Sequence, residues 1–178
     1  MLFALVTVAG CTPLATLRSP GMNADFEIGA GAVGVSPRPY VEEAWQATGQ
    51  MWFTAQVNSW FELSTVGAFD KNAGAVGVAA RAYYFRNRFF AGAAEVEAGY
   101  AWASFSLPMG VQPIQGVWIY TAPRIGMLGL HATPFVPLGL DIHLFAGFSL
   151  RAEAQVSWAD FEYYNRRFHV AGALAFAW

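Results

Sequence analysis

The residue types that could do chemistry gather in one alternating stretch near the C-terminus. Asp141, His143, Ser149 and Glu153 stand at odd positions within residues 138–158, so an extended chain would place all four on one face. A serine, a histidine and a carboxylate are the components of a nucleophilic hydrolase, in which the histidine takes the proton of the serine. Along one extended strand, however, Ser149 would lie roughly 20 Å from His143, too far for a hydrogen bond. The stretch therefore predicts no catalytic residue.

A metal site is the second chemistry that these residue types allow. Asp141, His143 and His169 would supply a carboxylate and two imidazoles if the last two strands pair, and zinc accepts such ligands. In a charged interior, two histidines and one carboxylate more often bond to neighbouring side chains. We therefore predict no metal and no cofactor.

The elements that would position these residues are β-strands, because apolar and polar residues alternate with a period of two. The alternation is strictest over residues 138–158, where every even position is apolar and every polar residue stands at an odd position. The pattern predicts eight strands, at 25–35, 44–57, 61–69, 75–84, 89–102, 117–127, 138–158 and 166–178. It predicts three connections at one end, at 58–59, 86–88 and 129–137, and four at the other, at 36–43, 70–74, 104–116 and 159–166.

Composition indicates that these strands face something other than water. The chain is 56% hydrophobic and only 12% charged, whereas soluble domains have roughly 25% charged residues. The apolar stretch 128–140 contains Pro134 and Pro137, and no other stretch supplies a spanning helix of ~20 apolar residues. A closed barrel is the other structure that satisfies its backbone inside a bilayer. The net charge of −2 and the single lysine argue against nucleic acid as a partner.

Eight alternating strands also fit a soluble lipocalin-like barrel, which would bury its apolar face. Here the face opposite the large apolar residues mixes Ala, Gly, Gln, Thr and charges, and it is too polar for a soluble core. Aromatic residues near strand ends favour two interface belts over a core stripe. These are Trp45, Trp60, Tyr84, Phe89, Phe90, Trp102, Trp158 and Trp178.

The even strand number, the alternation and the C-terminal aromatic residue resemble the small eight-stranded bacterial outer-membrane barrels of the OmpA/OmpX type. The resemblance covers residues 25–178 and implies an eight-stranded antiparallel up-and-down transmembrane β-barrel in a bacterial outer membrane. It further implies an insertion signal that the barrel-insertion machinery reads, carried by Phe168, Val170, Leu174, Phe176 and Trp178. Outer-membrane lipids, this machinery and an envelope protein are the expected partners.

The N-terminus resembles a bacterial lipoprotein signal. The sequence "LVTVAGC" resembles a lipobox, which implies a signal-peptide-like segment at 1–10 and lipid attachment at Cys11. Residues 11–24 would then form a flexible tether before a barrel domain at 25–178. The alternative is a buried cysteine in an apolar N-terminus. A single cysteine excludes an internal disulfide.

The interior of the predicted barrel would hold a network of titratable side chains. Its predicted members are Glu27, Glu62, Arg81, Glu95, Glu97, Arg124, Asp141, His143, Arg151, Glu153 and His169. Paired charges would plug the lumen, whereas an open track of acids would make a narrow channel or a small-ligand site. The plugged barrel with a structural or interaction role is the leading prediction. A lipid-modifying enzyme, an activity found on barrels of this size, is a third possibility.

Overall fold

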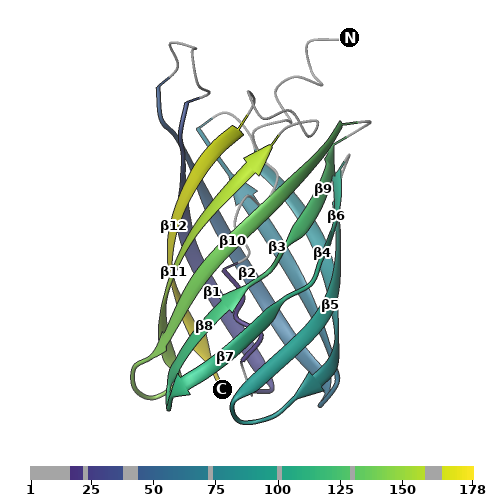
Figure 1. Cartoon of the computed structure of the whole chain (residues 1–178), viewed down its shortest axis with the longest axis vertical. Helices are drawn as coiled ribbons and strands as arrows, with labels where there is room; N and C mark the ends of the chain where they lie inside the picture. Colours follow the sequence, from purple (N-terminus) through teal and green to yellow (C-terminus); the bar gives the residue numbers. More distant parts are fainter. Residues whose placement is uncertain are drawn as a thin grey trace.

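The computed structural model of the chain describes residues 17–21, 24–37, 44–71, 74–99, 102–128, 131–158 and 166–178. These residues form a single sheet in which every strand pairing is antiparallel, and β1 pairs with β12 to close the sheet into a barrel (Figure 1). The strand segments are β1 (Phe26–Val35), β2 (Gln46–Asn58), β3 (Phe61–Phe69), β4 (Gly74–Arg86), β5 (Phe90–Gly99), β6 (Trp102–Ser106), β7 (Met109–Ile114), β8 (Val117–Thr121), β9 (Arg124–Leu128), β10 (His131–His143), β11 (Phe148–Trp158) and β12 (Arg166–Ala177). None of the described residues forms a helix that could cross a membrane.

The twelve segments make ten strands of barrel wall within the described residues. β6 and β7 both pair with β5, so they are one strand interrupted at Leu107–Pro108. β8 and β9 both pair with β10, and they are interrupted at Ala122–Pro123. Each interruption contains a proline, which has no backbone N–H to donate to the ladder. The prediction of an all-β antiparallel barrel is confirmed, and the predicted count of eight strands is wrong.

One missing strand was hidden inside the predicted strand 138–158, which is a hairpin of β10 and β11. Phe148 N donates to Phe145 O at 2.8 Å, and Ala146 and Gly147 both have positive φ, at 46° and 85°. Positive φ at both central residues is the pattern of a two-residue type I′ turn. Asp141 pairs with Arg151, so residues of equal parity face each other across this turn. The alternation therefore continues through the turn and does not reveal it.

The other missing strand lies in the stretch 104–116, which was predicted to be a loop. Its residues complete β6, form β7 and turn at Gln115–Gly116 into β8. The predicted turn at 129–137 is also wrong, because Pro134 and Pro137 lie inside β10. Proline favours turns in sequence reasoning, but it is also tolerated in strands where its missing N–H is not needed.

The two ends of the barrel differ in the length of their connections. Four connections lie at the end that carries the C-terminus, between β2 and β3, β4 and β5, β7 and β8, and β10 and β11. They span 59–60, 87–89, 115–116 and 144–147, and we call this the short-turn end. Five connections lie at the other end, including 36–45 and 159–165 (Figure 1). The predicted split of three and four is therefore wrong.

The outer face of the barrel is apolar and the inner face is polar. Large aliphatic side chains on separate strands are more than half exposed, including Ile28, Val76, Val96 and Leu138. Glutamates, arginines, glutamines and serines are buried inside instead. A soluble barrel has the opposite arrangement, which rules out the lipocalin-like alternative. An apolar outer face and a polar interior are the arrangement of a membrane-spanning barrel.

Most of the predicted interface aromatics are exposed, but Trp102 is an exception. Its indole points into the barrel and is only 6% exposed. It packs over Gly77 and Gly99, where an added Cβ would lie 2.6 Å and 2.2 Å from the nearest indole atom. These glycines provide the space for a large ring inside the wall, so Trp102 cannot anchor the barrel at a membrane interface.

Substitution of Leu138 by arginine should test which face meets lipid. Leu138 lies near the middle of β10 and is exposed, and an arginine at the bilayer midplane costs a barrel about 2–4 kcal/mol. We expect Leu138→Arg to lower the free energy of unfolding by about this amount in urea titrations of the barrel refolded into lipid vesicles. Phe145→Arg, in the exposed turn of the short-turn end, should cost about 0–1 kcal/mol. Equal costs for the two variants would contradict a lipid-facing outer surface.

Candidate functional site

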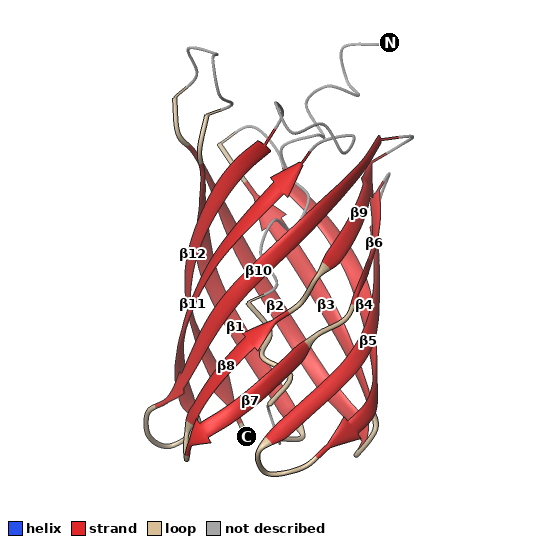
Figure 2. Cartoon of the chain, viewed as in Figure 1, coloured by secondary structure: helices blue, strands red, loops and turns tan. Residues whose placement is uncertain are grey.

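The lumen contains a piece of the chain itself. Leu17, Arg18, Ser19, Pro20 and Gly21 lie inside the barrel, and we call them the lumen segment (Figure 2). Leu17 has no exposed surface, and Arg18 and Ser19 are 5% and 2% exposed. Part of the predicted tether 11–24 is therefore enclosed by the wall, and the prediction of a flexible tether is wrong for these residues. Residues 1–16 and Cys11 lie outside the described residues.

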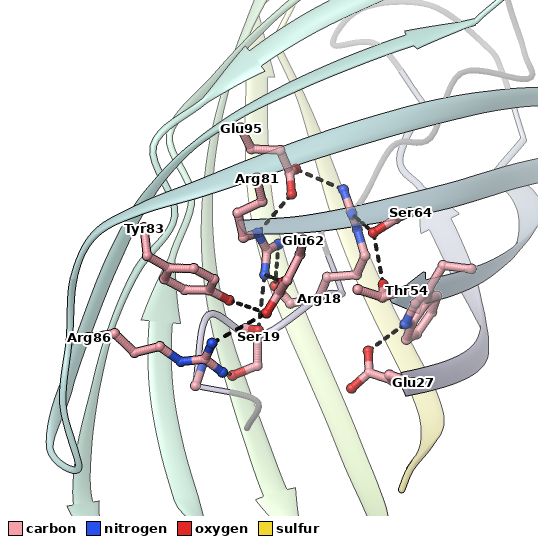
Figure 3. Close-up of polar contacts among 12 residues, drawn as sticks. Arg18, Ser19, Glu27, Thr54, Glu62, Ser64, Arg81, Tyr83, Arg86 and Glu95 are labelled. Atoms are coloured by element: carbon pink, nitrogen blue, oxygen red, sulfur yellow. Dashed lines mark hydrogen bonds and ion pairs between the residues drawn. The ribbon is translucent and has the colours of Figure 1, made fainter. Parts of the chain in front are cut away.

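Arg18 is the side chain that joins the lumen segment to β3 and β5. Its Nη2 lies 2.8 Å from Glu95 Oε1 and 3.8 Å from Glu97 Oε2. Its Nη1 donates to Ser64 Oγ at 2.7 Å, and the Ser64 hydroxyl is in turn 2.8 Å from Thr54 Oγ1 (Figure 3). Arg18 thus compensates two buried carboxylates that lie side by side on the inner face of β5.

Arg81, on β4, holds the backbone of the same segment. It donates from Nη2 to Arg18 O at 3.1 Å and from Nη1 to Ser19 O at 3.2 Å. Its Nε lies 2.8 Å from Glu95 Oε2, so Glu95 bridges the two arginines (Figure 3). Glu62 adds a second carboxylate, 3.7 Å from Arg81 Nη1. One wall arginine therefore satisfies carbonyl groups that the lumen segment could not pair by itself.

A second cluster binds the lumen segment from the opposite part of the wall, on β1, β10 and β11. Arg151 donates from Nη1 to Leu17 O at 2.8 Å and to Glu27 Oε1 at 2.9 Å. Its Nε lies 3.3 Å from Asp141 Oδ2. Leu17 N donates to Glu153 Oε2 at 3.1 Å. The lumen segment is thus fixed by both clusters, and it connects them.

Ten of the eleven predicted network residues are buried. They are Glu27, Glu62, Arg81, Glu95, Glu97, Arg124, Asp141, Arg151, Glu153 and His169. His143 differs, because its side chain is 41% exposed at the short-turn end, with Nε2 3.4 Å from Asp141 Oδ2. Arg124 stacks on Phe135, with 4.6 Å between the guanidinium carbon and the ring centroid.

Sequence reasoning missed two members of the charged interior, Arg18 and Arg86. Arg18 falls in the predicted tether and Arg86 in a predicted turn, so neither stands in an alternating pattern. Arg86 lies at the end of β4, 3.7 Å from Glu62 Oε1. With both included, the six interior carboxylates of the described residues meet five guanidinium groups rather than three. The predicted network contained six carboxylates and three guanidinium groups, and this excess of acids falls to one when Arg18 and Arg86 are counted.

The structure brings His143 and Ser149 together, contrary to the distance estimated for one continuous strand. They are directly opposite each other across the β10–β11 hairpin. The imidazole Nε2 faces Asp141, however, and no hydrogen bond joins the described His143 and Ser149 side chains. A second serine–histidine contact joins Ser157 Oγ and His169 Nε2 at 2.8 Å. Among the described residues, His169 Nδ1 has no hydrogen-bond partner, so none of them supplies the carboxylate that would orient a catalytic histidine.

The same geometry separates the candidate metal ligands. His143 ends β10 at the short-turn end, whereas His169 begins β12 near the opposite end. Among the described residues, no three potential ligands of the His, Cys, Asp or Glu type come together as a metal site. The titratable side chains of the interior therefore form ion pairs and hydrogen bonds around the lumen segment.

Comparisons with known proteins agree with the fold. No family model and no curated protein matches the sequence. Among solved structures, the KdgM porin in complex with disordered oligogalacturonate is 9% identical, with a TM-score of 0.51, over 85% of this chain and 99% of that one. Neisserial surface protein A is 10% identical with a TM-score of 0.41, over 87% and 98% of the two chains. Ail, the attachment invasion locus protein of Yersinia pestis, is 11% identical with a TM-score of 0.42, over 88% and 99%. The chain thus shares the barrel fold of the KdgM porin.

Proposed function

We propose that the protein is a β-barrel of a bacterial outer membrane whose lumen is closed by its own lumen segment, and that it has a structural or interaction role in the cell envelope. The single observation that carries this proposal is the double attachment of Leu17–Gly21. Arg81 and Glu95 hold the segment on one part of the wall, and Arg151 and Glu153 hold it on another.

The width of the barrel explains why a plug is needed. Eight strands enclose an interior that side chains alone can fill, and the diameter grows with the number of strands. A ten-stranded wall leaves room for a further piece of chain. The segment in that room brings backbone groups that would cost free energy if they were buried without partners. Arg81, Arg151 and Glu153 supply those partners, so the closed lumen is a stable state of the barrel.

The outer surface and the connections support the membrane location. Bacterial outer-membrane barrels have an even number of strands, an apolar outer band and short turns at the periplasmic end. All three features are present, so we assign the short-turn end to the periplasm. Outer-membrane lipids are then direct partners of the apolar face, and an envelope protein is the remaining expected partner.

The last strand fits the proposed insertion signal. Phe168, Val170 and Leu174 are exposed on the outer face, as is Trp178 just after β12. Phe176 stacks on Trp178 with 5.5 Å between the ring centroids. Acylation of Cys11 is a separate proposal about the N-terminus. A diacylglyceryl mass on the N-terminal peptide of the purified protein would support it, and an unmodified Cys11 would reject it.

Planar-bilayer recording tests the closed lumen. We expect the full-length protein, inserted as a folded barrel, to show no single-channel steps, because the lumen segment fills the interior and its charges are paired. Insertion is verified by heat-modifiable gel migration of the same sample. A steady conductance of the unmodified protein would overturn the closed-barrel proposal.

A second candidate is a gated channel in which the lumen segment moves. The observation that favours it is that β1 and β12 close the wall without any contribution from Leu17–Gly21. Removal of the segment would leave a complete barrel with a charged interior. The KdgM porin, a porin by its name, shares this fold.

A further inference from the structure

A groove crosses the outer face of the barrel wall, separate from the lumen and its plug. Its volume is about 450 Å³, within the range of small-molecule sites. Ala30 and Gly67 contribute to its floor, and the larger outward side chains of Met51, Val76 and Leu174 stand around them. We call it the wall groove.

The pairing of the strands explains why the wall is hollow there. Five residues form one row across β12, β1, β2, β3 and β4, in the order Leu174, Ala30, Met51, Gly67 and Val76. Directly paired residues of an antiparallel sheet point to the same face, so large and small residues alternate along the outer surface of this row. A Cβ added at Gly67 would lie 3.2 Å from Met51 Cγ, so the methionine packs closely over the glycine.

Aromatic rings border the wall groove toward the short-turn end. The rings of Phe148, Phe176, Trp178, Phe26 and Phe53 follow one another across β11, β12, β1 and β2, with neighbouring centroids 4.8–6.0 Å apart. Contacts of this kind contribute about 0.5–1.5 kcal/mol each, so the border is preformed. Aromatic side chains of barrels gather at the membrane interface. The wall groove therefore begins near the interface of the short-turn end and extends toward the middle of the bilayer.

The surroundings of the wall groove determine what can fill it. It is continuous with the lipid-facing surface, because exposed Leu150 and Val78 extend the apolar wall beyond it on β11 and β4. Among the described residues that line it, Thr65 is the only polar one with an outward-facing side chain. The groove thus offers almost no hydrogen-bonding groups, and it suits an alkyl chain rather than a polar ligand.

A second copy of the chain would fit the wall groove poorly. A two-fold symmetric dimer brings the same patch of both copies together. Two hollows would then face each other, and the side chains around the void would lose their contacts. A flexible alkyl chain can follow the hollow and restore these contacts.

We propose that the wall groove binds one acyl chain of a phospholipid from the inner leaflet of the outer membrane. This inference rests on the membrane location of the barrel and on the assignment of the short-turn end to the periplasm. Lipid tails are as apolar as the wall, so van der Waals contacts with Met51, Leu174 and Phe176 hold the chain, rather than hydrophobic transfer. The headgroup would lie beyond the aromatic border, at the level of Trp178.

Native mass spectrometry tests the site, with phosphatidylethanolamine titrated into the detergent-solubilised, full-length barrel. Ala30→Leu and Gly67→Leu fill the floor of the groove with side chains that are compatible with lipid. We expect the Kd of the tightest-bound phospholipid to rise at least about tenfold in each variant, which corresponds to about 1.4 kcal/mol. Ala98→Leu is the matched control, because Ala98 is exposed on β5, away from the groove, and it should bind like the unmodified protein. Ala30→Leu keeps the test decisive if Gly67→Leu does not fold.

Cross-linking in nanodiscs tests the position and the source of the chain. With phosphatidylethanolamine that carries a diazirine in one acyl chain, we expect stronger labelling at Ala30 and Met51 than at Ala98, and weaker labelling there in Gly67→Leu. Equal binding by all variants would overturn the proposal. So would tighter binding of lipid A, which would assign the groove to the outer leaflet, or a dimer that dissociates in Ala30→Leu, which would assign it to a second copy. Failure of the proposed function would appear separately, as a steady conductance or as the absence of heat-modifiable migration in the unmodified protein.

Discussion

Reversal of the charge of Arg18, in Arg18→Glu, is expected to convert the silent barrel into a conducting one. Arg18 is the only lumen-segment side chain that pairs with the carboxylates of Glu95 and Glu97 within the described residues. A glutamate there would place a third negative charge beside these two in a buried site, where like charges repel strongly. The lumen segment would lose its attachment to β5, and its displacement would open the interior. Planar-bilayer recording should then show discrete steps, with cations preferred because carboxylates outnumber the remaining guanidinium groups.

The matched control is Arg18→Lys, which keeps the positive charge at the same position. It should stay silent or nearly so, although lysine cannot pair simultaneously with Glu95 and Ser64 as the arginine fork does. Both variants should migrate as folded, heat-modifiable barrels, because Arg18 is not part of the wall. A folded Arg18→Glu barrel without conductance would show that Arg18 does not hold the plug.

The inner and outer faces of the barrel could be predicted from the sequence because successive side chains of a strand point alternately into the barrel and outward. Glu27, Arg81, Glu95 and Arg151 stand at alternating positions with apolar neighbours, and each is buried inside the wall. The alternation of polar and apolar residues is a strong signal here, because a strand that presented its other face to the membrane would place a charged side chain in lipid. It says nothing about which acid meets which arginine, since that depends on strand order and on tilt.

The number of strands could not be predicted because the decisive turns lack the usual signals. Type I′ turns favour Asn-Gly, whereas here Ala146 precedes Gly147 with a positive φ of 46°. Pro108 and Pro123 indicate breaks, yet the chain continues along the same wall strand on both sides. Leu107 N donates to Pro123 O at 3.0 Å, so the two interruptions lie side by side and support each other. Such pairing of irregularities is visible only in three dimensions.

The plug was equally inaccessible to sequence reasoning. The lumen segment has no periodicity, because it is neither a strand nor a helix, and its Pro20–Gly21 pair is typical of a loop. Its burial follows from long-range contacts, such as the bond from Arg151 to the Leu17 carbonyl. The wrong prediction of a tether also explains the apparent acidic surplus, since Arg18 was left out of the interior.

Loss of Arg151 should have the largest effect on stability. Its guanidinium group is 1% exposed and contacts Glu27, Asp141 and the Leu17 carbonyl. In Arg151→Met, two carboxylates would stay in the interior without their cation, and removal of one partner from a buried ion pair costs about 3–5 kcal/mol. We expect a decrease of about this size in the free energy of unfolding, measured by urea titration in lipid vesicles. Tryptophan fluorescence provides the signal, because Trp52 lies close to Arg151 and donates to Glu27 Oε1 at 2.6 Å.

A triple variant separates the ion pair from simple loss of packing. Arg151→Met combined with Glu27→Gln and Asp141→Asn removes the stranded charges and keeps side chains of nearly the same shape. Replacement of a whole buried charge cluster is often close to neutral, so the triple variant should recover most of the stability that the single variant loses. If Arg151→Met costs less than about 1 kcal/mol, or if the triple variant is as unstable as the single one, the Arg151 cluster does not hold the wall together as an electrostatic unit. In that case the closed interior would depend on packing around Leu17 rather than on its charges.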